Sequence, residues 1–153
     1  MSLLATIRPD SWNFPLFIHI LGALTLVGAL VVAASYLFVA RRDGSLELVN
    51  ASFRSLLYAA VPAYIVMRIG AEWIVSKEDL ADSDAAWIGI GFMTADVGLL
   101  FIIISTVAAW MGLRRARANG SGGGPGITVA AVLVGILIVA YVVAIWAMST
   151  KPV

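Results

Sequence analysis

The sequence predicts an all-helical integral membrane protein, an antiparallel four-helix bundle in which residues 1–153 form one transmembrane domain. Three observations predict this fold. Hydrophobic residues make up 61% of the chain and charged residues only 12%, whereas soluble domains are about one quarter charged. Four stretches are long and apolar enough to cross a bilayer, which takes about 20 residues. Arginines gather in two of the three polar connections.

The predicted spans follow one another with short connections and lie at about residues 14–40, 53–75, 87–112 and 127–148. Pro15 stands at the start of the first span, and Arg41 and Arg42 follow its end. This apolar run is too long for a signal peptide, and its arginines follow rather than precede it, so we expect a retained anchor. Inside a bilayer every backbone polar group must pair within its own helix, which favours a bundle of helices over any open sheet.

Basic residues predict the orientation, because Lys and Arg are retained in cytoplasmic loops. The first and third connections carry Arg41, Arg42, Arg54, Arg114, Arg115 and Arg117. The other side carries three basic residues and an acidic cluster: Arg8, Lys77, Lys151, Glu78, Asp79, Asp82 and Asp84. Four tryptophans fall at this second boundary: Trp12, Trp73, Trp87 and Trp146. We therefore expect both termini outside, in a multi-pass protein of a cell membrane, with the bacterial inner membrane as the expected location.

Four ionisable side chains fall inside the predicted spans: His19, Arg68, Glu72 and Asp96. At 1.5 Å per residue, His19 lies roughly 8 Å deep, Arg68 about 11 Å and Asp96 about 13 Å. Tyr141 of the fourth span reaches a similar level. A lone aspartate at this depth costs at least about 2.5–3.5 kcal/mol, so we expect it to face a partner inside the bundle. The sequence predicts an Arg68–Asp96 contact, with Glu72 and His19 nearby.

Two interpretations of this polar cluster stay open. Intramembrane ionisable groups commonly mark functional sites. A buried ion pair can also simply fix the register of packed helices, while Glu72 lies close enough to the surface to be solvated. Arg68 can reach the interface with its long stem.

Composition excludes several kinds of chemistry. The chain has no cysteine, which removes disulfides, iron–sulfur clusters and thiolate metal sites. Its single histidine rules out a site of several imidazoles within one chain, and we predict no metal site. A net charge of +1 gives no case for nucleic acid binding. The segment "NGSGGGPG" lacks the Lys-Ser/Thr of a phosphate loop. No motif predicts an enzyme.

The first span contains "FIHILGALTLVGAL", in which His19 precedes Gly22 and Gly28. This stretch resembles the opening helix of small bacterial membrane families, namely the copper-resistance D-type proteins and the haem-binding, protoporphyrinogen-oxidase-like four-helix proteins. The resemblance covers about one span. It implies a four-helix membrane fold and a histidine associated with haem or metal.

Three functional classes follow, of which the sequence favours the first. The first is an accessory or structural subunit in the lipid bilayer, which belongs to a homo-oligomer or docks onto a larger membrane complex. The second is a redox protein that binds haem b or a quinone, with these candidate residues: His19, Arg68, Tyr64, Met67 and Met93. In this second class, His19 is the axial ligand and Arg68 pairs with a propionate or quinone oxygen. The third is a small transporter or proton relay that uses Asp96 and Glu72.

Overall fold

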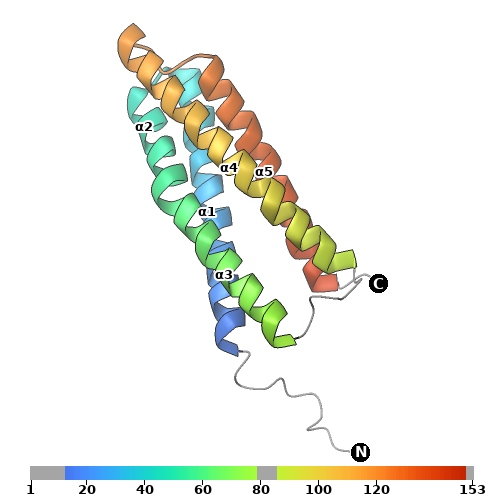
Figure 1. The fold of residues 1–153 in the computed structure, drawn as a ribbon. Coiled ribbons are helices and arrows are strands. Elements are labelled where there is room, and N and C mark those ends of the chain that lie inside the picture. The colour runs from blue at the N-terminus through green and yellow to red at the C-terminus, as the bar shows by residue number, and fades with distance from the viewer. Residues whose placement is uncertain (1–12, 79–85, 151–153) are drawn as a thin grey trace, which may run out of the picture.

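The computed structural model describes residues 13–78 and 86–150, and every secondary-structure element in these ranges is a helix (Figure 1). The elements are α1 (Asn13–Asp43), α2 (Leu46–Ser55), the π-helical turn η3 (Leu56–Ala60), α3 (Val61–Glu78), α4 (Ala86–Asn119) and α5 (Pro125–Thr150). Because α2, η3 and α3 continue one another, the described chain forms four helices long and apolar enough to cross a membrane. This confirms the all-helical class and the four apolar helices. Several residues used to predict the orientation lie outside the described ranges: Arg8, Trp12, Asp79, Asp82, Asp84 and Lys151.

The second helix begins well before the predicted span, at Leu46 rather than near residue 53. Gly44, with φ of 69°, ends α1, and its N–H donates to the carbonyl of Ala40 at 2.9 Å. Ser45 then caps α2, because its hydroxyl oxygen accepts a hydrogen bond from the N–H of Leu48 at 3.4 Å. The polar residues of this connection mark the edge of the apolar region, but helix α2 includes several of them.

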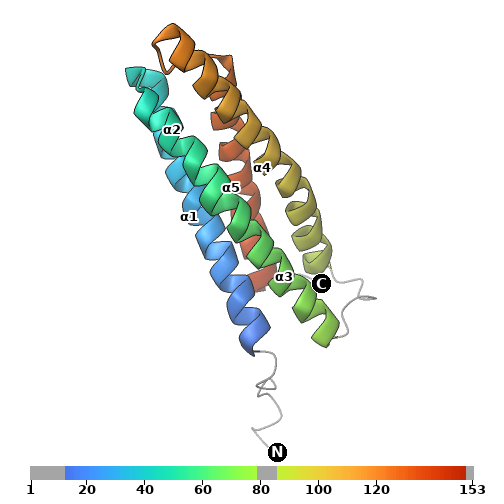
Figure 2. The same cartoon turned by 60° about the vertical axis from the view of Figure 1, so that its left-hand side comes forward.

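Two pairs of helices dominate the packing. α1 packs mainly on α3, and α4 on α5, whereas α3 and α4 barely touch. Figures 1 and 2 show α3 and α4 diverging toward the end of the bundle where α1 begins and α5 ends. At the opposite end α2 packs against α4. The two pairs are therefore held together at one end and spread apart at the other.

Small side chains and two serines join α1 to α2. Ala29 and Ala33 are buried on α1, as expected for residues that permit close helix approach. Ser52 donates its hydroxyl hydrogen to the carbonyl of Ala33 at 3.1 Å, and Ser55 donates to the carbonyl of Ala29 at 2.9 Å. These bonds fix the rotation of α2 about its axis.

The π-helical turn η3 separates α2 from α3 directly before Pro62. Pro62 has no N–H to donate and its ring crowds the preceding turn, so a wider turn relieves the conflict. The N–H of Val61 donates to the carbonyl of Leu56, five residues earlier. One extra residue in the turn rotates all later side chains by about 100° relative to an uninterrupted helix. η3 thus sets which face α3 presents to its neighbours.

Candidate functional site

Two glycines bring α1 and α3 into backbone contact near His19. A Cβ at Gly22 would lie 2.5 Å from the backbone N of Met67, and a Cβ at Gly70 would lie 2.6 Å from the backbone N of His19. Neither position has room for a side chain. This approach places Nδ1 of His19 3.0 Å from the carbonyl oxygen of Met67.

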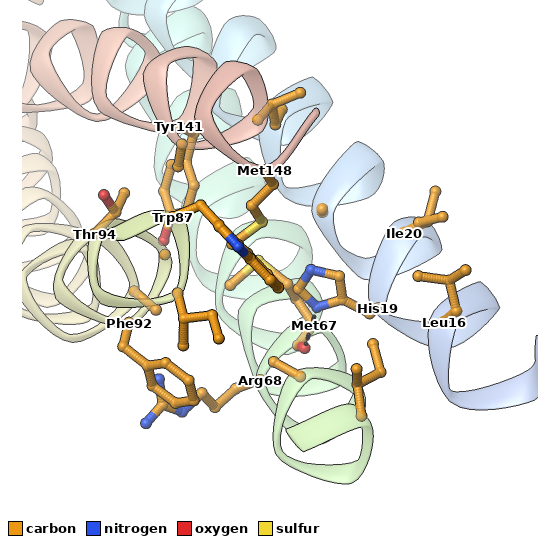
Figure 3. Close-up of a pocket in the computed structure, with 18 of the residues that line it drawn as sticks. Leu16, His19, Ile20, Met67, Arg68, Trp87, Phe92, Thr94, Tyr141 and Met148 are labelled. Carbon is orange, nitrogen blue, oxygen red and sulfur yellow. Dashed lines mark hydrogen bonds between the residues drawn. The ribbon is translucent and has the colours of Figure 1, made fainter. Parts of the chain in front are cut away.

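The hydrogen bond to Met67 determines the tautomer of His19. A carbonyl oxygen only accepts, so Nδ1 must carry the hydrogen that it donates. In the neutral imidazole, Nε2 is then a bare acceptor. Figure 3 shows the ring of His19 beside Met67, facing Met148 and Trp87. The same arrangement orients imidazoles that bind metals or hydrogen-bond donors through the second nitrogen.

His19 lines a cavity of about 400 Å³ that lies where α3 and α4 diverge. Four helices contribute to its walls: α1, α3, α4 and α5. The lining is mostly apolar and includes Leu16, Ile20, Ile88, Phe92 and Ile145. A mostly apolar hollow with a few polar groups, in this size range, is typical of small-molecule sites.

Tyr141 also lines the cavity, although its hydroxyl is buried against α4. It lies on α5 with 5% of its surface exposed. Its hydroxyl has no hydrogen-bond partner among the described residues. Gly98 on α4 makes room for it, since a Cβ there would lie 2.6 Å from the Tyr141 hydroxyl oxygen. Buried hydroxyls nearly always have a partner, so this one has unused hydrogen-bonding capacity.

The charged side chains form a cluster across the gap between α3 and α4. Nη2 of Arg68 lies 2.9 Å from Oε1 of Glu72, and Nη1 lies 3.2 Å from Oδ1 of Asp96. The guanidinium also stacks over Phe92, with its Cζ 4.7 Å from the ring centroid. The structure therefore contains the expected Arg68–Asp96 contact. We call Arg68, Glu72 and Asp96 the ionic bridge.

The ionic bridge lies on the flank of the molecule, in contrast to the expected position inside the bundle. The side chains of Glu72 and Asp96 are 53% and 64% exposed, and neither lines the cavity. The reason is the small contact between α3 and α4, which leaves the outward faces of both helices open here. Of the three, Arg68 alone lines the cavity.

The other candidate residues divide between the site and its surroundings. Met67 lines the cavity, and its carbonyl holds His19. Tyr64 is buried in the core but lies outside the cavity lining. Met93 is 71% exposed on the outward face of α4 and is not part of the lining. The thioether that does line the cavity with Met67 is Met148 of α5, which sequence reasoning missed.

Within residues 13–78 and 86–150, no group of three or more His, Cys, Asp or Glu side chains is placed to hold a metal ion. Comparisons of the chain with models of protein families, with characterised proteins and with solved structures gave no match. The cavity and the chemistry of the side chains around it are therefore the features of the molecule that bear on its function.

Proposed function

We propose that this chain is a membrane-embedded binding protein for a lipid-soluble cofactor, of the quinone or haem class, held in the cavity with His19 as the polar anchor. We further propose an antiparallel bundle with both termini outside the cytoplasm. The cavity then lies in the outer half of the membrane, with the bacterial inner membrane as the proposed location.

The observation that carries the proposal is the placement of the His19 ring. Its Nδ1 is held by the Met67 carbonyl, and its ring faces an apolar cavity of about 400 Å³ (Figure 3). Protein interiors are close-packed and leave few voids larger than a water molecule. A space of this size between four helices favours a bound molecule over packing of the helices alone. A transporter that used Asp96 and Glu72 would need these carboxylates in the cavity, yet neither lines it.

A matched pair of substitutions on α5 tests the proposal. Ala144 lines the cavity, whereas Ala140, one turn away, lines a separate shallow groove of α5. The full chain is purified in mild detergent, its visible spectrum is recorded, and its lipid-soluble molecules are extracted and identified by mass spectrometry. We expect one enriched molecule or chromophore in the wild type and in Ala140→Phe, and its loss in Ala144→Phe.

Equal extracts from all three proteins, with no molecule enriched over the membrane background, would contradict the proposal. If the protein then also eluted in a stable larger complex, the accessory-subunit class would take its place.

A further inference from the structure

We infer that the cavity binds a neutral, lipid-soluble hydroquinone, with one hydroxyl donating to Nε2 of His19 and the apolar faces of its ring lying against the cavity lining. The inference rests on the proposed function and names the ligand class of the same site. Three observations carry it: the charge around the cavity, the hydrogen-bonding capacity of its wall, and its opening toward the bilayer.

The charge distribution selects a neutral ligand. Arg68 is the charged residue of the lining among the described residues, and it already contacts two carboxylates. Ionised, the ionic bridge carries one more negative than positive charge. An anionic ligand would find Arg68 already paired with two carboxylates, and a cationic ligand would find no carboxylate inside, since Glu72 and Asp96 face the flank.

The hydrogen-bonding groups select a ligand that carries hydroxyls. Nε2 of His19 is an acceptor, so its partner must bring an O–H or N–H. A quinone has only carbonyl oxygens and cannot donate to it, but a hydroquinone can.

The walls around His19 suit the ring of such a ligand. His19 comes from α1, and Trp87 and Met148 lie beside it in Figure 3. A hydroquinone carries its two hydroxyls at opposite ends of a flat ring whose faces are apolar. The apolar and aromatic lining suits those faces.

The opening of the cavity suits a ligand that arrives from the bilayer. α3 and α4 barely touch, and the ionic bridge with Phe92 spans the gap between them. A hydrocarbon tail attached to the ring can extend through this gap into lipid, so the cavity needs to enclose only the head of the molecule.

The test is a titration of the full chain in lipid nanodiscs with a decyl-substituted benzohydroquinone, followed by calorimetry. The matched probes are the quinone of the same compound and its dimethyl ether, which lacks both O–H donors. We expect the hydroquinone to bind roughly 10-fold more tightly than the ether, and more tightly than the quinone. The preference over the quinone should disappear in His19→Leu.

A control variant lies outside the cavity. Tyr58→Phe removes a hydroxyl from a side chain that is 69% exposed on the outside of η3, and should leave binding unchanged. Elution volume on gel filtration establishes that each variant is folded.

The outcomes separate this inference from the proposed function. If the hydroquinone and its ether bind equally, and Ala144→Phe abolishes both, the ligand class is wrong while the cavity still binds lipid-soluble molecules. A haem spectrum that depends on His19 would likewise overturn the hydroquinone. Binding that is unchanged in Ala144→Phe would overturn both, whereas a hydroquinone that fails to bind the wild type would overturn the ligand class alone.

Discussion

At the scale of single residues, the site depends on positions where a side chain is absent. Gly22 and Gly70 let the backbones of α1 and α3 touch, and this contact puts Nδ1 of His19 within 3.0 Å of the Met67 carbonyl. The imidazole is thus oriented by backbone atoms, which have less freedom than any side-chain partner. Its hydrogen-bonding direction should change only when the helices move.

Substitution of Gly70 tests this directly. A Cβ there would lie 2.6 Å from a backbone atom of His19, so Gly70→Ala must push the helices apart. Overpacking of this kind typically costs 1–3 kcal/mol. We expect a lower melting temperature, measured by tryptophan fluorescence in detergent, together with weaker ligand binding. Gly28→Ala is the control, because no atom lies within 4 Å of its Cβ position. Equal melting temperatures for the two variants would disprove the role of the contact.

The depth of each side chain in the membrane, counted along the sequence, predicted part of the site and missed the rest for one reason. Counting residues gives the height of a side chain in the membrane but not its rotation about the helix axis. The Arg68–Asp96 contact needed only matching heights, and the structure contains it. Met93 matches in height too, but it shares the outward face of α4 with Asp96. Met148 reaches the cavity because α5 turns that face inward.

At the scale of elements, the ends of the helices were harder to predict than their number. Hydropathy reports where the apolar region stops, and it located four helices correctly. Helix ends depend on local hydrogen bonds instead, such as the cap that Ser45 gives to Leu48. η3 was also missed, although Pro62 inside an apolar run was the available signal for an irregular turn.

The π-helical turn sets the rotation of α3 and can be tested by deletion. Serine hydrogen bonds hold α2 against α1, so deletion of Ala59 should rotate the α3 residues by about 100°. Met67 and Arg68 would then leave the cavity wall. We expect ligand binding to fall at least about tenfold, which corresponds to about 1.4 kcal/mol, with little change in helix content by circular dichroism. Deletion of Gly123, in the exposed α4–α5 connection, should have no such effect. Unchanged ligand binding after deletion of Ala59 would show that η3 does not set the rotation of α3.

At the scale of the whole molecule, two helix pairs joined at one end leave the other end able to open. The backbones of α3 and α4 have little mutual contact, and the ionic bridge with its stacking on Phe92 spans the gap between them. A ligand that passes through the gap must therefore separate these side chains.

A chemical link across the gap tests whether ligands pass there. The chain has no cysteine, so Arg68→Cys/Asp96→Cys carries the molecule's two thiols, and a short bifunctional thiol reagent can join them. We expect the joined protein to take up and release ligand more slowly than the same variant before joining. Stopped-flow fluorescence gives both rates. Unchanged rates in the joined protein would place the route elsewhere.

The gap between α3 and α4 has a thermodynamic consequence for how ligand binding is measured. A molecule seated there exchanges with the surrounding lipid phase, so the relevant concentration is its mole fraction in the bilayer. Each methylene added to a tail that remains in lipid improves partitioning from water by about 0.8 kcal/mol. Apparent affinity referred to the aqueous concentration would then rise about fourfold per methylene, while affinity referred to the membrane stays constant.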